Sequence, residues 1–188
     1  MHFSKDKKWG EMKGWFQNLF GEKSGPAARG RIETFLKENK VSYQLLPHPE
    51  AFSALELAES LHVTGKRVAK VVVVRAKRRY VMTVLPSHLY INLERLARLL
   101  KAGPVSLATE AELTALFPDC EAGAMPPFGN LYGLPVYVDL SLTREPLLFF
   151  RAGTHREVIE MRYRDFSDLV HPEVGIFTSA PSEWIVAA

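Results

Sequence analysis

The stretch Val68-Ala-Lys-Val-Val-Val-Val-Arg75 decides how this sequence is expected to fold. It is a nearly continuous β-branched run, which is typical of a central strand that is buried on both faces. The segment 79–85 follows after a short gap and is expected to pair with the run as a hairpin. These two segments therefore predict the centre of a β-sheet.

Helical and extended segments flank this hairpin on both sides. Upstream we expect a short helix around residues 32–36, a strand at 41–46, and a helix opened by a capping box of Ser53 with Glu56. Downstream we expect helices after Asn92 and Thr109, strands at 134–140, 147–150 and 158–163, and a helix at 165–170 before a loose tail. Because helices and strands mix without regular βαβ alternation, the pattern predicts an α+β domain with a mostly antiparallel or mixed sheet.

The composition is that of an ordinary globular protein. The chain has 188 residues, of which 47% are hydrophobic and 24% charged, and this length suits one domain with a real core. No apolar run approaches the roughly 18 residues that a membrane span needs. The N-terminal lysines precede no continuous apolar stretch, so we expect no signal peptide. With one cysteine, Cys120, the chain can form no internal disulfide, and we expect a cytoplasmic protein.

The formal charge of +3 is unevenly distributed along the chain. Residues 1–31 carry a net charge of +4, which leaves −1 for the rest, so charge alone does not mark the main domain as a nucleic-acid binder. We expect an amphipathic appendage and linker at residues 1–28, a main domain at 29–172 and a C-terminal tail at 173–188. The appendage either docks on the main domain or makes peripheral contacts with a membrane surface or RNA phosphates.

Lys70 is the first chemical anomaly in the sequence. It interrupts an otherwise apolar strand, and strand periodicity places it on the same face as Val68 and Val72. An ammonium group is costly there unless its side chain reaches solvent or an anion. Two interpretations therefore stay open: an edge-strand lysine in water, or a lysine at the floor of a cleft that binds a phosphate or carboxylate.

Two further segments have unusual backbone or side-chain chemistry. In Gly123-Ala-Met-Pro-Pro-Phe-Gly129 the prolines fix φ and lack an N–H, while the glycines permit unusual backbone angles. We expect a stiff, exposed loop that preorganises hydrogen bonds to a ligand or water, with a purely structural turn as the alternative. Gly153-Thr-His155 stands at the entry to a strand, where the imidazole is either presented to a site or structural.

These three segments, in this order, resemble the YbaK / prolyl-tRNA-synthetase-associated editing domains. Gly65-Lys-Arg-Val-Ala-Lys-Val-Val-Val73 resembles their lysine-bearing strand, residues 123–129 resemble their Gly-x-x-Pro-Pro loop, and residues 153–155 resemble their late Gly-x-His segment. His48-Pro49 and Ser53 fit upstream. The resemblance covers about residues 30–172. It implies a single α+β domain whose mixed, strongly curved β-sheet is flanked by helices.

The resemblance also implies a function. Members of this family hydrolyse the ester that joins an amino acid to the 3′-terminal adenosine of a mischarged tRNA, acting in trans, with substrate-assisted chemistry and without a metal or cofactor. Lys70 would engage the phosphate of the terminal nucleotide, and His155 would line the aminoacyl pocket. The partners implied are the aminoacyl-tRNA 3′ end and an aminoacyl-tRNA synthetase. The substrate-binding residues implied are Ser53, Gly123, Ala124, Met125, Pro126, Pro127, Phe128, Gly129, Gly153 and Thr154.

Three other functions compete with this interpretation. A thiol hydrolase would pair Cys120 with His155, but Asp119 and Glu121 flank the thiol and disfavour its thiolate. A metal hydrolase is disfavoured because the histidines show no zinc-ligand spacing. A non-catalytic module that binds a nucleotide or the tRNA 3′ end stays open, as does the identity of the amino acid removed.

Overall fold

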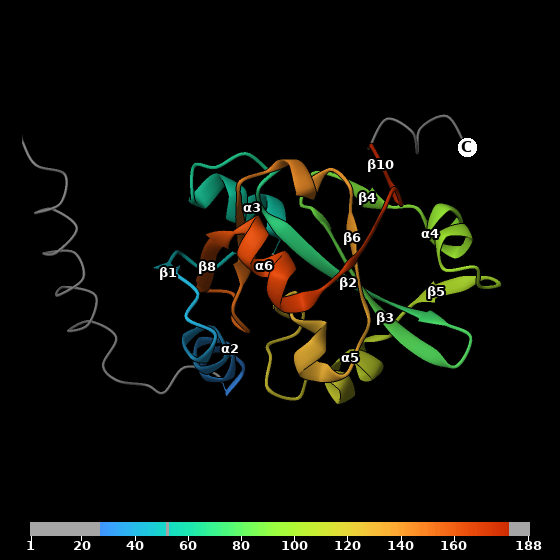
Figure 1. The fold of residues 1–188 in the computed structure, drawn as a ribbon, viewed down its shortest axis with the longest axis horizontal. Helices are drawn as coiled ribbons and strands as arrows, with labels where there is room; N and C mark the ends of the chain where they lie inside the picture. The colour runs from blue at the N-terminus through green and yellow to red at the C-terminus, as the bar shows by residue number, and fades with distance from the viewer. Residues whose placement is uncertain (1–26, 52, 181–188) are drawn as a thin grey trace, which may run out of the picture.

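A mixed five-stranded sheet forms the centre of the computed structural model, which describes residues 27–51 and 53–180 (Figure 1). Its strands lie in the order β5 (Val105–Leu107), β2 (Ala69–Ala76), β3 (Arg79–Pro86), β6 (Val136–Asp139) and β9 (Glu173–Gly175). β2 is antiparallel to β5 and β3, whereas β3–β6 and β6–β9 are parallel pairs. The hairpin and the α+β class with a mixed sheet are thus confirmed.

A second, antiparallel sheet adjoins the first. It consists of β1 (Tyr43–Pro47), β8 (Glu157–Arg162) and β7 (Leu147–Arg151) in that order. A parallel bridge between Val68 and Phe149 joins β7 to the start of β2. A small third sheet pairs β4 (Tyr90–Ile91) with β10 (Thr178–Ser179). The bridge is important for the site because it aligns β2 and β7 in the same direction.

Short helices pack around these sheets, and local capping signals determine where several of them begin. They are α2 (Ala27–Glu38), α3 (Ala54–Ser60), α4 (Leu93–Leu99), α5 (Glu110–Leu116) and α6 (Tyr163–Val170), with 3-10 turns at Gly129–Tyr132 and Leu142–Arg144. Both predicted capping boxes are present at the starts of α3 and α5, and Asn92 caps α4. No helix in the described ranges is long and apolar enough to cross a membrane.

The core consists of three hydrophobic clusters that meet at β2. Ala69 and Val73 face the largest cluster, which also contains residues from α2 and α6. Val68 faces a small cluster under α3, and Val74 faces a third cluster under α4. Lys70 lies on the face of Val68 and Val74, between the clusters of α3 and α4, because side chains alternate along a strand.

The segment after residue 172 differs from the loose tail that the sequence predicts. β9 pairs with β6, and Phe177 is fully buried against residues of α4 and β6. The Asp139 carboxylate accepts a hydrogen bond from the Phe177 backbone N–H at 3.1 Å. Residues 173–179 therefore belong to the packed domain. The predicted appendage at 1–28 lies almost wholly outside the described residues, as do residues 181–188.

Candidate active site

Lys70 lies on β2 as a half-buried cation with few partners. Its Nζ donates a hydrogen bond to the Ser87 carbonyl at 3.1 Å and lies 5.0 Å from the centroid of the Tyr90 ring. Burial lowers the pKa of the ammonium group. An ammonium has three N–H donors, so two remain beyond the bond to Ser87. No Asp or Glu within the described ranges forms an ion pair with it, and the group is therefore suited to binding an anion.

Arg151, at the end of β7, connects separate segments of the site. It is 8% exposed, and its Nη2 donates to the carbonyls of Ala51 at 2.7 Å and Ser53 at 2.9 Å. Its Nη1 donates to the Gly123 carbonyl at 3.1 Å. Desolvation lowers the pKa of the guanidinium, while the nearby carboxylates of Glu56 and Glu121 act in the opposite direction. Arg151 thus ties the start of α3 to the predicted loop.

The register of the β2–β7 bridge relates these two cations. Val68 and Phe149 are bridged in parallel, and both pack in the cluster under α3. Lys70 and Arg151 each follow two residues later on the same strand face. Each of the two bridged strands therefore carries one cation two residues beyond the junction between the sheets.

The His155 imidazole is buried against main-chain carbonyls. Its Nε2 lies 2.8 Å from the Ala122 carbonyl oxygen, and its Nδ1 lies 3.2 Å from that of Ala51. A neutral imidazole has one N–H and can donate to one of these oxygens, whereas an imidazolium can donate to both. The His155 backbone N–H donates to a Glu121 carboxylate oxygen at 2.7 Å. The ring is therefore held beside the loop rather than presented on the surface.

The loop at 123–129 differs from the exposed loop that the sequence predicts. Gly123 is exposed and has φ +79, but residues 124–129 are buried. Phe128 is fully buried and packs edge-to-face against Phe35, Phe150 and Phe166, with ring centroids 5.5 to 6.0 Å apart. The two prolines lack N–H groups, so burying them leaves no donor unsatisfied. The expectation of outward-pointing groups therefore applies to the Gly123 end alone.

Other predicted site residues are positioned by close packing. A Cβ on Gly129 would lie 2.5 Å from a methyl group of Val136, so this glycine serves the core. Gly153 has φ +96, and a Cβ there would lie 2.6 Å from that of Ala28. The Gly153 N–H donates to the Ala124 carbonyl at 3.0 Å. Met125 and Thr154 are also buried.

The structure brings together three of the predicted segments and adds one residue. Ser53, Gly123 and residues 153–155 converge around Arg151, while Lys70 has separate contacts with Ser87 and Tyr90. The sequence reasoning missed Arg151. Its signal was available, because Leu147-Leu-Phe-Phe-Arg151 is an apolar strand with one charge, the same anomaly that singled out Lys70.

Cys120 is poorly suited to nucleophilic chemistry. Burial raises the pKa of its thiol to about 11, and the Asp119 carboxylate acts in the same direction. The sulfur lies 3.4 Å from the Tyr132 hydroxyl. A thiol with this pKa is almost entirely protonated at neutral pH, whereas the nucleophilic form of cysteine is the thiolate. Among the described residues, no group of three or more His, Cys, Asp or Glu side chains could hold a metal ion.

Comparison with known protein families matches the aminoacyl-tRNA editing domain to residues 48–169. The chain belongs to this family. The matched range includes Lys70, Arg151 and His155, and it confirms the resemblance to YbaK-type editing domains. No protein of curated function matches the sequence.

Solved structures share the fold of this editing domain. One described as a candidate trans-editing enzyme for prolyl-tRNA synthetase has a TM-score of 0.74 at 21% identity, over 84% of this chain and all of that one. The hypothetical protein APE2540 has a TM-score of 0.72 at 20% identity, over 79% and 99% of the two chains. A candidate signal transduction protein from Marinobacter aquaeolei VT8 has a TM-score of 0.64 at 14% identity, over 80% of this chain and 31% of that one.

Proposed function

We propose that this editing domain is a deacylase that acts in trans and hydrolyses the ester bond of mischarged aminoacyl-tRNA. The observation that carries the proposal is the half-buried Lys70 ammonium, which has two N–H donors beyond its bond to Ser87. In a domain of the editing family, a phosphate of the terminal nucleotide is the anion that such a group would bind.

Hydrolysis needs a water molecule, an oriented ester and a place for the developing charge. Water adds to the ester carbonyl carbon, the bond to the ribose oxygen breaks, and that oxygen takes a proton, which releases the amino acid and the tRNA. We assign orientation of the ester to the segment around Gly123 and His155, next to Arg151. A ribose hydroxyl or the side chain of the bound amino acid helps to orient the water.

The other predicted residues have supporting roles in this proposal. Ser53 offers its backbone region beside Arg151, and Gly153 and Thr154 hold the loop from behind. Phe128 and Gly129 stabilise the loop from within the core. The substrate partner is an aminoacyl-tRNA in the cytoplasm, and a synthetase that releases mischarged tRNA is the proposed protein partner.

A deacylation panel tests this proposal. Purified protein is incubated with tRNAs charged with alanine, cysteine, serine, threonine or proline, on cognate and non-cognate tRNAs, and released amino acid is measured. We expect faster release from at least one mischarged tRNA than from its correctly charged counterpart, and loss of that release in Lys70→Met. Binding of tRNA without release from any substrate would instead identify a non-catalytic tRNA-end binding module.

A further inference from the structure

The β2–β3 hairpin and its flanks form a strongly basic ribbon. Residues 65–93 contain seven Lys or Arg and no Asp or Glu. Because the whole chain has a formal charge of +3, all other residues together carry −4. Outside residues 1–31, which carry +4, the positive charge is thus concentrated on the hairpin that bears Lys70. Arg67 and Arg75 pair with Glu145 and Glu112, and the remaining hairpin cations can attract a polyanion.

The tip of the hairpin is the most exposed part of this ribbon. Lys77, Arg78 and Arg79 are all exposed, and Ala76 pairs with Arg79 to close the turn. Lys77 has φ +57, a left-handed conformation that favours glycine. A lysine there costs about 1 kcal/mol of backbone strain. The sequence therefore carries a cation where a glycine would make a more stable turn.

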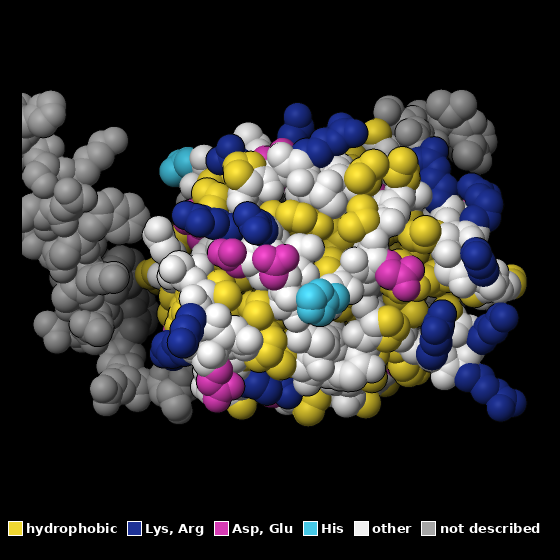
Figure 2. All heavy atoms as spheres, viewed as in Figure 1, with side chains coloured by type: hydrophobic (Ala, Val, Ile, Leu, Met, Phe, Trp, Pro, Cys, Tyr) yellow, Lys and Arg dark blue, Asp and Glu magenta, His cyan; other side chains and the backbone are white. Residues whose placement is uncertain are grey.

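The C-terminal end of α4 adds to the same surface. Val105 pairs with Ala76, so the segment after Lys101 runs directly to the base of the tip. Arg98 and Lys101 are exposed. Figure 2 shows Lys and Arg side chains gathered at the end of the molecule where Figure 1 places the hairpin, β5 and α4. No ion pair involves Lys77, Arg78, Arg98 or Lys101 within the described residues, so their charge is not neutralised locally.

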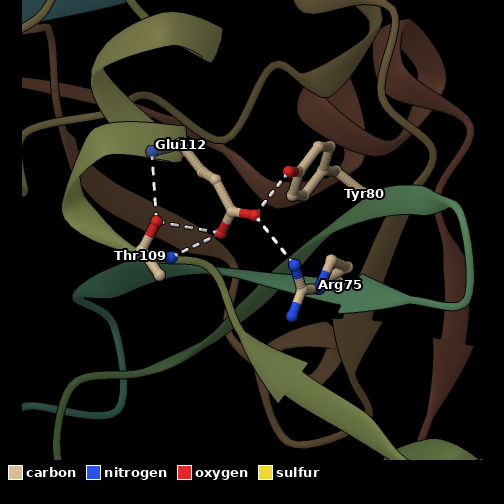
Figure 3. A network of polar contacts seen from close by, with 4 residues as sticks. All are labelled: Arg75, Tyr80, Thr109 and Glu112. Atoms are coloured by element: carbon tan, nitrogen blue, oxygen red, sulfur yellow. Dashed lines mark hydrogen bonds and ion pairs between the residues drawn. The ribbon is translucent and has the colours of Figure 1, made fainter.

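The residue pair next to the tip is anchored, which holds the tip in place. Arg75 and Tyr80 are directly opposed across β2 and β3, and both donate to the same Glu112 carboxylate oxygen, at 3.2 and 2.7 Å (Figure 3). The other Glu112 oxygen accepts from the Thr109 backbone N–H at 2.7 Å. One carboxylate thus fastens the hairpin to the first turn of α5.

The length of β2 sets the distance between the tip and the proposed anion site. Seven residues separate Lys70 from Lys77, and a strand advances about 3.3 Å per residue, so the two lie about 23 Å apart. Double-stranded DNA advances about 3.4 Å per nucleotide along one strand, and an A-form RNA duplex rises somewhat less, so this distance corresponds to at least about seven nucleotides of a tRNA stem. An RNA whose 3′ end reaches Lys70 can therefore present its double-stranded stem to the tip.

We propose that the hairpin tip and the end of α4 bind the phosphate backbone of the tRNA acceptor stem while its 3′ end occupies the Lys70 site. This inference rests on the proposed function. The tip contacts phosphates and not bases, so it adds affinity and orientation without selecting a sequence. The hairpin tip would let one enzyme bind the stems of different tRNAs, while the aminoacyl site around Gly123 and His155 selects the amino acid.

The test uses a short RNA stem with an unpaired 3′ end and no amino acid, whose binding is measured by fluorescence anisotropy. The variant Lys77→Gln/Arg78→Gln removes two phosphate contacts, which lowers the slope of log affinity against log salt by about 1.8. Between about 50 and 200 mM salt, wild-type affinity should therefore fall about 12-fold more than that of the variant. The matched control is Lys37→Gln/Lys40→Gln, which removes two exposed cations at the end of α2, one of them also left-handed. It should keep the wild-type slope.

Equal slopes for the wild type and the tip variant, or the same change in the control, would overturn the inference. A second arm separates it from the proposed function. Hydrolysis of an aminoacylated 3′-terminal trinucleotide, which has no stem, should be the same in the wild type and the tip variant, whereas kcat/KM for full tRNA should fall at low salt. Stem binding that depends on the tip in a protein with no hydrolysis would support the surface and refute the deacylase.

Discussion

Replacing Arg151 by methionine tests whether the site depends on this one guanidinium. The change removes three hydrogen bonds to the carbonyls of Ala51, Ser53 and Gly123. None of these oxygens is left wholly without a partner. Ser53 O also accepts from the Leu57 N–H at 3.2 Å, Ala51 O lies 3.2 Å from His155 Nδ1, and Gly123 is exposed to water.

The expected loss of stability follows from this arrangement. A net hydrogen bond is worth about 1 kcal/mol when the abandoned acceptor keeps another partner, so the three bonds are worth about 3 kcal/mol. Removing a buried guanidinium also removes its desolvation cost, which leaves a loss of about 1–2 kcal/mol. For a domain of this size, that lowers the melting temperature by about 3–6 °C.

The expected loss of activity is larger. Without Arg151 the Gly123 end of the loop is no longer tied to the start of α3, and a misplacement of about 1 Å can cost about 100-fold in rate. Thermal unfolding and single-turnover deacylation at saturating RNA measure the two losses separately. RNA affinity should be nearly unchanged, because the stem and Lys70 contacts remain.

Two variants control this experiment. Arg156→Met removes a neighbouring arginine whose side chain is 63% exposed and pairs with Glu50 at 3.3 Å. It should change stability by less than about 1 kcal/mol and leave the rate intact. Arg151→Lys keeps the positive charge but not the planar guanidinium, so its deacylation rate should lie between those of Arg151→Met and the wild type. A wild-type single-turnover rate in Arg151→Met, with a lowered melting temperature, would show that Arg151 is structural alone and would refute the reasoning.

Three further outcomes are expected. Lys70→Met should lower the deacylation rate on the order of 100-fold, as does loss of one electrostatic contact in other active sites. It should not lower the melting temperature, because it removes a half-buried charge. A deacylation rate near that of the wild type would contradict the assignment of Lys70. Cys120→Ser should keep most of the deacylation activity. Alkylation of Cys120 by iodoacetamide in the wild type should be slow at neutral pH and accelerate towards pH 11, where the thiolate forms. Rapid alkylation at pH 7 would argue for an activated thiol. Gly153→Ala should destabilise the fold by about 1–3 kcal/mol in chemical denaturation, because Gly153 has φ +96, which alanine adopts only with strain, and the new methyl would lie 2.6 Å from the Ala28 Cβ; an unchanged midpoint would contradict this account of Gly153.

The parts of the fold that were predictable have local signals. The β2–β3 hairpin follows from one continuous β-branched run and its alternating neighbour, and both capping boxes follow from residue types three positions apart. β9 and β10 were missed for the opposite reason. They are three and two residues long, and their pairing with β6 and β4 depends on Phe177 packing far away in sequence.

The candidate site shows the same division. Lys70 was visible as a charge inside an apolar run. The burial of residues 124–129 was not visible, because it depends on Phe128 meeting Phe35, Phe150 and Phe166 from three other elements. Gly and Pro in sequence indicate a constrained loop but do not indicate which side of that loop packs inward.

Lys70 on β2 and Arg151 on β7 each lie two residues beyond the bridge between these strands, and their different surroundings suit them to different roles. Arg151 donates to three carbonyls through its two Nη atoms and has the carboxylates of Glu56 and Glu121 nearby, although its buried Nε has no hydrogen-bond partner among the described residues, so its charge is partly compensated within the fold. Lys70 uses one of its three donors on a single carbonyl and forms no ion pair with a described Asp or Glu. Both ammonium and guanidinium lose hydration on burial. Arg151 regains part of this hydration free energy through its protein contacts, whereas in the proposed function Lys70 regains it when the substrate phosphate binds. A compensated cation fixes geometry in every state of the protein. An uncompensated one gains most from binding, and this difference is the physical reason to place the substrate phosphate at Lys70 and the organisation of the loop at Arg151.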